Sequence, residues 1–176
     1  EMLPLAWHWY EQSRFFGSVP FFADVFIERN AFDAGQSQRI LETAKAIGLG
    51  IKAHVDQFTN LGGSRIAISV GAASIDHLDA ISDKEIAELA ASDTIGIVIP
   101  TENFSAGKTQ FANARKLIDA GCAIALSTDY NPGSAPCPSQ PMAMAISCRY
   151  QKLLPSEAFN AATVNAAYAI GLGDRV

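Results

Sequence analysis

Short runs rich in β-branched and apolar residues recur along this chain of 176 residues. Their starting points are separated by roughly 20 to 30 residues, which is the length of one strand–helix unit. The segments between them carry apolar residues at helical spacing, for example Ile40, Ala44 and Ile47. Because strands and helices alternate, we predict a parallel sheet covered by helices. The predicted strands are residues 24–28, 51–55, 73–77, 94–100 and 123–129.

Turn and capping residues separate these segments. Gly48, Gly71 and Gly121 each fall between a helical pattern and the following strand, where a left-handed C-terminal cap favours glycine. Ser82 and Glu85 have the spacing of a capping box at a helix N-terminus. After the last predicted strand come two further helical patterns, at residues 142–151 and 155–169.

A parallel sheet of this kind is either an open doubly wound sheet or a closed (β/α)8 barrel. The predicted strands are too few to complete a barrel. An open sheet that binds a dinucleotide is expected to carry G-x-G-x-x-G after a strand, and the sequence has no such motif. The polar residues at the strand ends must therefore decide between the two architectures.

Polar residues lie at or just beyond the carboxyl ends of the predicted strands, where barrel enzymes build their active sites. A single strand-end His is more often a hydrogen-bonded structural residue, and an Asp before Asn-Pro-Gly can equally form a turn or a helix cap. Burying several such groups without partners is costly, so their shared position indicates a site. These residues are His54, Gln57, His77, Asp129 and Asn131.

Imidazole and carboxylate groups in this position fit a metal hydrolase. They suit zinc or iron, and an open coordination position can carry an activated water. We predict that His54 and Asp129 are metal ligands and that Asp129 also shuttles a proton to the leaving nitrogen. His77 is predicted to polarise or hold the substrate carbonyl oxygen as charge develops there.

Five sequence blocks carry a resemblance: residues 54–58, 60–63, 73–78, 127–134 and 160–167. They resemble the corresponding blocks of imidazolonepropionases, which are amidohydrolases. The resemblance runs from about Asp24 to the end of the chain, and the Asn-Pro-Gly-Ser run that begins at Asn131 is its most specific part. It implies an α/β fold, the amidohydrolase-type (β/α)8 TIM barrel. Residues 1–176 would form a partial barrel domain that supplies about the last five strands.

The resemblance also implies the reaction and the catalytic residues. The reaction is metal-dependent hydrolysis of the cyclic amide of 4-imidazolone-5-propanoate to N-formimidoyl-L-glutamate, a step of histidine degradation. His54 and Asp129 would bind one zinc or iron ion, and His77 and Asp129 would be the catalytic residues. No organic cofactor is implied.

A set of substrate-binding residues is implied in the same way. Gln57 would contact the imidazolone ring. The propionate or formimidoyl-glutamate portion would be bound by Asn131, Gly133 and Ser134. An amide side chain accepts and donates hydrogen bonds but cannot transfer a proton, so Gln57 is predicted to orient the substrate.

One departure from the family pattern is the absence of a His-x-His motif, which in the family supplies two metal ligands. A catalytically incomplete barrel fragment is therefore one alternative. Another is a different amidohydrolase such as a nucleobase deaminase, which shares the barrel, the metal and the strand-end residues. Gln57 weighs against that alternative, because those deaminases carry an acid there that protonates the ring nitrogen.

Charge and composition restrict the partners and the location. A net charge of −5 with no cluster of Lys and Arg argues against nucleic acid. No apolar run approaches the roughly 20 residues of a membrane helix, and no signal peptide is recognisable. We therefore expect a soluble cytoplasmic protein with no membrane partner. Without Cys-x-x-Cys spacing, free thiols are expected at Cys122, Cys137 and Cys148.

The N-terminal segment is rich in aromatic residues, among them Trp7, Trp9 and Phe22. We expect it to pack in a core or between subunits rather than to bind a ligand. In a partial barrel the first strand would also be unpaired, which favours association between copies. The expected partners are a small-molecule substrate and, as one expected assembly, a second copy in a homodimer.

Overall fold

The computed structural model describes residues 4, 5, 8 and 20–176, and the fold is built around one parallel β-sheet. Its strands pair in chain order, each with the next along the sequence. The strands are β1 (Phe22–Ile27), β2 (Gly50–Val55), β3 (Ser74–His77), β4 (Ile95–Val98) and β5 (Ile124–Leu126). All the predicted strands are confirmed, although β4 and β5 end two or more residues before their predicted limits.

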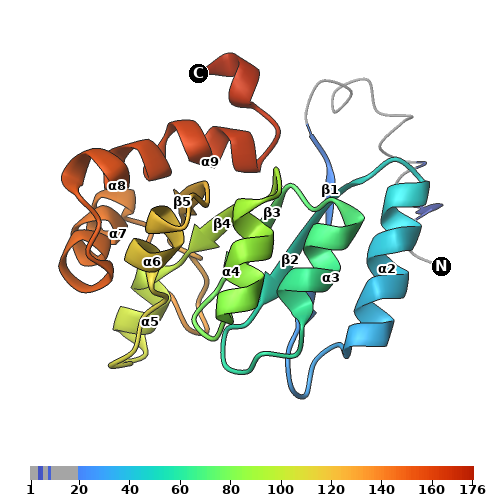
Figure 1. Cartoon of the computed structure of the whole chain (residues 1–176), viewed down its shortest axis with the longest axis horizontal. Helices are drawn as coiled ribbons and strands as arrows, with labels where there is room; N and C mark the ends of the chain where they lie inside the picture. The colour runs from blue at the N-terminus through green and yellow to red at the C-terminus, as the bar shows by residue number, and fades with distance from the viewer. Residues whose placement is uncertain (1–3, 6–7, 9–19) are drawn as a thin grey trace.

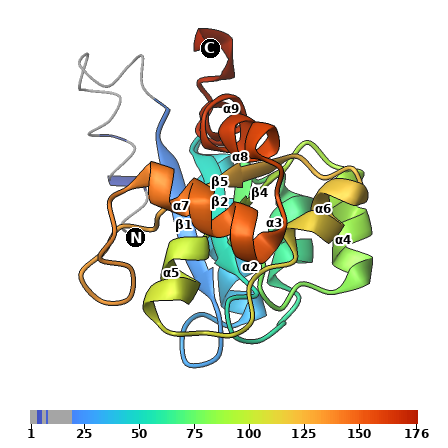
Figure 2. The same cartoon turned by 90° about the vertical axis from the view of Figure 1, so that its left-hand side faces the viewer.

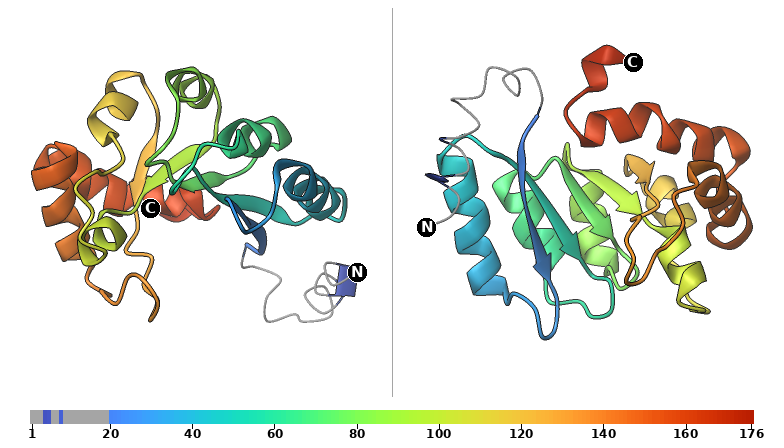
Figure 3. Two further views of the ribbon diagram at one scale, coloured as in Figure 1. Left: turned by 90° about the horizontal axis from the view of Figure 1, so that it is seen from below. Right: turned by 180° about the vertical axis from the view of Figure 1, so that it is seen from behind.

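Helices fill the connections between strands and continue after β5. They are α2 (Ala34–Ala46), α3 (Gly63–Val70), α4 (Asp83–Ala90), α5 (Pro100–Ser105), α6 (Ala114–Asp119), α7 (Gln140–Ile146), α8 (Pro155–Ala162) and α9 (Val164–Ala169). The sheet is curved, and α2, α3, α4 and α6 lie along its convex face (Figures 1 and 3). The helices α5, α7 and α8 gather at the β5 end (Figure 2).

The convex face forms the main core, because alternate strand residues are apolar and point toward the helices. In β1 and β2 these buried residues are Val25, Ile27, Ile51, Ala53 and Val55. The residues between them, including Asp24, Lys52 and His54, point to the concave face and are at least partly exposed. One side of the sheet therefore holds the core, and the other side presents polar groups.

A smaller apolar cluster covers part of the concave face. Ala169 of α9 packs there with Ile95 and Ile97 of β4 and Ala125 of β5. Of the residues that the structure describes, those of β1 and β5 pair with one neighbouring strand only. Within the described ranges the sheet is thus open at both edges, as expected for part of a barrel.

The predicted caps are confirmed. Gly48, Gly71 and Gly121 have φ values of 87°, 81° and 92°, the left-handed conformation that ends a helix. The Ser82 side chain accepts a hydrogen bond from Glu85 N, and the Glu85 carboxylate accepts one from Ser82 N. Together these bonds start α4 directly after the loop that follows β3.

The two predicted C-terminal helices differ in detail from the observed ones. The first consists of α7 and a π-helical turn, Ser147–Gln151. The second is not continuous, since Thr163 adopts φ −127° and ψ −83° and separates α8 from α9. Just beyond the break, the Asn165 side chain donates to Ile124 O at 2.8 Å. This bond attaches α9 to β5 of the sheet.

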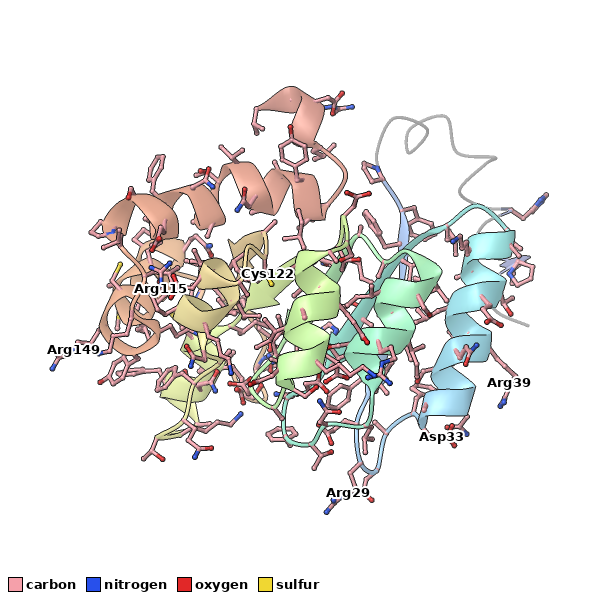
Figure 4. All side chains as sticks on the ribbon, in the orientation of Figure 1. Arg29, Asp33, Arg39, Arg115, Cys122 and Arg149 are labelled. Atoms are coloured by element: carbon pink, nitrogen blue, oxygen red, sulfur yellow. The ribbon has the colours of Figure 1, made fainter. Side chains whose placement is uncertain are left out.

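Three other expectations concern the rest of the chain. The cysteines are free thiols, as predicted, and Cys122 is buried with its Sγ 3.5 Å from Ile86 O of α4 (Figure 4). Of the aromatic N-terminal residues, Trp7 and Trp9 lie outside the described residues, while Phe22 begins β1. Among the described helices, each is too short or too polar to cross a membrane.

Candidate active site

A cavity of about 440 Å³ opens at the carboxyl ends of β2 and β3. It brings together side chains that are far apart in the sequence. Five of the predicted site residues line it: His54, Gln57, His77, Asp129 and Ser134. Asp24, Val25 and Phe26 of β1 complete its wall. The parallel order of the strands is what places these ends next to one another.

His54 is held by two carboxylates from the neighbouring strands. Its Nδ1 lies 3.0 Å from Asp24 Oδ1 and 3.8 Å from Asp76 Oδ2. Burial lowers the pKa of His54, but the hydrogen bond to Asp24 and the nearby negative charges outweigh it and raise the pKa above its ordinary value. With Nδ1 engaged by Asp24, Nε2 is the ring nitrogen available to a ligand.

His77 is a buried imidazole without a full set of partners. It is 1% exposed, and its Nδ1 has no hydrogen-bond partner among the described residues. The centroids of its ring and the His54 ring are 5.2 Å apart. Burial, followed by the positive charges of His54 and Lys108, lowers the pKa of His77 to about 3. The side chain is therefore a neutral imidazole near pH 7.

The backbone at His77 is also unusual. His77 and the next residue, Leu78, have φ values of 82° and 66°, and Asp129 has a φ of 50°. Such values are uncommon outside glycine and cost on the order of 1 to 3 kcal/mol each. Backbone strain of this kind gathers at functional sites, where surrounding structure holds it in place.

Asp129 follows β5 and lines the same cavity as His54. Burial raises the pKa of its carboxyl group, the charge on His54 lowers it, and Glu102 raises it further. The backbone N of Asp129 donates to Ser127 Oγ at 3.1 Å. A carboxyl group with a raised pKa next to an imidazole can both bind a cation and accept a proton.

The turn after Asp129 is organised by Asn131. Its Oδ1 accepts hydrogen bonds from the backbone N of Gly133 and of Ser134, both at 2.8 Å. Its Nδ2 donates to Asp129 O at 2.7 Å. The Asx-turn considered for Asp129 is thus built by Asn131 instead. Of the three predicted substrate binders in this loop, Ser134 lines the cavity and the other two shape the turn.

Gln57 lies where two cavities meet. It lines the cavity beside His54 and also a second one of about 510 Å³. The second cavity is bounded by Asp79, Asn103 and Lys108, and Lys108 Nζ lies 4.5 Å from the centre of the Phe58 ring. The amide of Gln57 can therefore contact a ligand that extends from one cavity into the other.

Asp24 and Asp76 were not predicted from the sequence. With His54 they form a group whose ligand atoms all lie within 4.8 Å of one another. The signal that could have found them is strand register, since β2 residue His54 is paired with Asp76 in β3 and with Phe26 in β1, two residues after Asp24. The register between parallel strands depends on how the sheet packs, so the spacing of residues along the sequence does not predict it.

The donor set can be tested for its fit to a metal ion. Lys52 Nζ lies 3.8 Å from Asp76 Oδ2, so a cation bound between Asp24, His54 and Asp76 would meet a fixed positive charge. None of the residues that line the 440 Å³ cavity is a Lys or Arg, and Asp129 offers it a carboxylate. An imidazole nitrogen and a carboxylate suit zinc or iron. By donor chemistry, His54 and Asp129 therefore suit such an ion.

Sequence comparison places the chain among known proteins. A model of the family described as Amidohydrolase family matches residues 31–176. The imidazolonepropionase of Chloroflexus aggregans is 53% identical over 99% of this chain and 41% of its own length. That of Herpetosiphon aurantiacus is 51% identical over 100% of this chain and 41% of its own length. The chain thus spans about two fifths of the length of these curated relatives.

Solved structures share the fold. An adenosine deaminase from Xanthomonas campestris with bound Zn superposes with a TM-score of 0.77 at 16% identity, over 98% of this chain and 43% of that one. The guanine deaminase of E. coli superposes with a TM-score of 0.74 at 14% identity, over 99% of this chain and 46% of that one. At these identities the likeness concerns the fold alone, and it covers only part of each neighbour.

Proposed function

Because this chain belongs to the amidohydrolase family and is part of an amidohydrolase-type TIM barrel, we propose that its protein hydrolyses the cyclic amide of 4-imidazolone-5-propanoate. The product would be N-formimidoyl-L-glutamate. Identities of 53% and 51% to imidazolonepropionases support the proposal. The observation that carries it is the convergence of His54, His77 and Asp129 on one cavity of about 440 Å³.

His54 and Asp129 are the residues that would hold one zinc or iron ion. Such an ion, when bound, supplies a Lewis acid that makes water a nucleophile near neutral pH. Two protein ligands are fewer than the three or more of a catalytic site. Since the chain spans 41% of its curated relatives, we propose that the remaining ligands come from other parts of the natural protein. We expect the 176-residue chain alone to bind the metal weakly and to turn over no substrate.

Asp129 would move the proton. Its carboxylate accepts the proton of the water that attacks the ring carbonyl, and it then donates that proton to the ring nitrogen as the C–N bond breaks. One carboxyl group can thus serve as base and then as acid.

His77 would stabilise the carbonyl oxygen. A neutral imidazole can donate one N–H to an oxygen that gains negative charge, and a pKa lowered to about 3 keeps His77 neutral. The donor is already buried in the cavity wall, so it needs no reorganisation during the reaction. Neutrality also avoids repulsion of a cation bound at His54, whose ring centre is 5.2 Å away.

The substrate would be oriented by Gln57 and the loop after β5. Gln57 is proposed to hydrogen-bond the imidazolone ring, and Ser134 to bind the propionate or product portion through its hydroxyl, which lines the same cavity. Asn131 and Gly133 are proposed to contribute to this binding from the turn that presents Ser134.

A nucleobase deaminase is the second candidate. The fold likeness to adenosine and guanine deaminases favours it, but only at 14% to 16% identity. Gln57 disfavours it, because an amide cannot protonate a ring nitrogen. A third reading, a catalytically incomplete fragment, rests on the absence of a His-x-His motif from the 176 residues.

The test is a hydrolysis assay on the complete natural protein. Loss of imidazolone absorbance is followed with and without a metal chelator, beside the Asp129→Asn variant. Turnover that the chelator abolishes and that the variant lacks supports the reaction and the proton path. If metal binds but imidazolonepropanoate is not consumed, the proposal fails, and ammonia release from guanine or adenosine then tests the deaminase reading.

A further inference from the structure

We propose that Glu28 is a positioning residue that fixes Gln57 in the site through the backbone of the loop between β2 and α3. Glu28 directly follows β1, and Gln57 is the second residue after β2. Because β1 and β2 are neighbours in the sheet, their ends lie side by side. The inference rests on the proposed function, in which Gln57 orients the substrate.

The Glu28 carboxylate accepts hydrogen bonds from the residues that follow Gln57. Oε2 accepts hydrogen bonds from Phe58 N at 2.9 Å and Thr59 N at 3.0 Å. Oε1 accepts from Arg29 N at 2.7 Å and from the Thr59 hydroxyl. Three of these four donors belong to the two residues directly after Gln57. One side chain just after β1 thus holds the backbone of the loop that carries Gln57.

Burial and charge make this contact strong. Glu28 is 3% exposed, whereas its neighbour Arg29 points outward into solvent (Figure 4). Burial raises the pKa of Glu28, but the hydrogen bonds from Thr59, Arg29 and Phe58 lower it further than burial raises it. The group is therefore an anion at neutral pH, and hydrogen bonds to an anion are about twice as strong as neutral ones.

The loop is also tied on its other side. Asp56 O accepts from Ala80 N at 2.7 Å, which fixes the residue before Gln57. Asn60 Nδ2 donates to Glu85 Oε2 at 2.5 Å, which connects the end of the loop to α4. Glu28 supplies the acceptor for the backbone of Phe58 and Thr59, which lie between Gln57 and Asn60. Without it, the backbone N–H groups of Phe58 and Thr59 would lose the acceptor that holds them.

Gln57 itself has no such support. Among the described residues its side chain makes no hydrogen bond that would hold it, and it is only partly buried between the two cavities. Its position thus depends on the backbone on either side. Displacement of a substrate-orienting group by about 1 Å can lower a rate by about 100-fold, so a support of this kind has catalytic consequences.

A double-mutant cycle in the complete protein tests the inference. The variants are Glu28→Gln, Gln57→Ala and the two combined, with kcat and KM for imidazolonepropanoate as the readout. Glu28→Gln keeps the size of the side chain but removes its charge. Glu42→Gln on α2 is the matched control, because Glu42 is exposed and its one hydrogen-bond partner within the described part of the chain is Gln38. Thr59→Val is a milder variant that removes a single donor to Glu28.

If Glu28 acts through Gln57, Glu28→Gln lowers kcat/KM about tenfold in the wild-type background and less than about twofold in the Gln57→Ala background. Thr59→Val shows a smaller effect of the same kind, and Glu42→Gln shows none. Equal losses in both backgrounds would mean that Glu28 supports the fold in general, which overturns the inference.

A measurement that needs no turnover separates this inference from the proposed function. The side-chain amide of Gln57 gives an NMR signal that is assigned by its loss in Gln57→Ala. We expect Glu28→Gln and Thr59→Val to move this signal toward the position of a solvent-exposed glutamine, with Glu42→Gln leaving it unchanged. An unmoved signal in Glu28→Gln would overturn the inference even if the protein is an imidazolonepropionase. Absence of turnover by the wild-type protein would instead count against the proposed function.

Discussion

The Nδ1 atom of His54 lies 3.0 Å from Oδ1 of Asp24, so one carboxylate selects the tautomer and the orientation of the imidazole. If Nδ1 carries the proton and donates it to Asp24, Nε2 keeps the lone pair that a metal ion requires. Asp76 Oδ2, 3.8 Å from the same nitrogen, adds a second negative charge. Carboxylates of β1 and β3, on the concave face of the sheet, thus orient the His54 ring through its Nδ1 atom.

Asp24→Asn tests this relationship. An amide can still accept a hydrogen bond, but it lacks the charge that raises the basicity of the imidazole. We expect the affinity of the complete protein for zinc or iron to fall about 10- to 100-fold, as measured by chelator competition. Asp93→Asn is the control, because Asp93 is exposed and lies outside the cavity. Equal metal affinity in the two variants would contradict the assigned role of Asp24.

His77 should make folding stability depend on pH. Its folded pKa is lowered to about 3, against 6.5 for an ordinary His, so the unfolded chain binds the extra proton more readily. The resulting stability is complete above about pH 6.5 and is lost as the pH falls toward about 3. The free energy of unfolding of the metal-free protein is measured in urea between pH 7 and pH 4. It should therefore fall less steeply with decreasing pH for His77→Gln than for wild type. Parallel curves would rule out a buried neutral His77.

The turn after Asp129 should be sensitive to Asn131. Asn131→Ala removes the acceptor for Gly133 N and Ser134 N and the donor to Asp129 O. Because the turn presents Ser134 to the cavity, we expect KM for imidazolonepropanoate to rise about tenfold or more, equivalent to roughly 1.4 kcal/mol of binding. Asn131→Asp keeps the acceptor oxygen, so its KM should rise less than that of Asn131→Ala. An unchanged KM in Asn131→Ala would contradict this account of the loop.

Gly63 begins α3 at a position with no room for a side chain. A Cβ there would lie 2.9 Å from Val55 Cγ1 and 3.3 Å from Ile27 Cβ. Both partners are buried, so we expect Gly63→Ala to lower the free energy of unfolding by about 1 to 3 kcal/mol in urea titrations. Gly35→Ala, where the nearest atom would be 3.5 Å away, is the control and should be neutral or slightly stabilising. Equal stability of the two variants would contradict the close packing of α3 on the sheet.

The local sequence pattern predicts where strands and helices occur, but it does not predict all of their ends. Residues 94–100 read as one β-rich run, yet β4 stops at Val98 because Pro100 starts α5 and cannot donate to a ladder. Residues 155–169 read as one helix, yet Thr163 interrupts it where α9 turns onto β5. Both differences arise from contacts or backbone conformations that the period of apolar residues does not encode.

The sequence by itself determined the alternation of strands and helices, the caps at Gly48, Gly71 and Gly121, and which polar residues stand at strand ends. These features depend on neighbours within a few residues, so local periodicity and propensity are enough to predict them.

Only the tertiary structure decided how the polar groups pair. Asp24 meets His54 across 30 positions of sequence, and Glu28 meets Thr59 across 31. Whether such groups touch depends on the register between β1 and β2, and that register is set by packing of the whole sheet against its helices. The burial that keeps His77 neutral likewise exists only once the strands and loops around it have assembled.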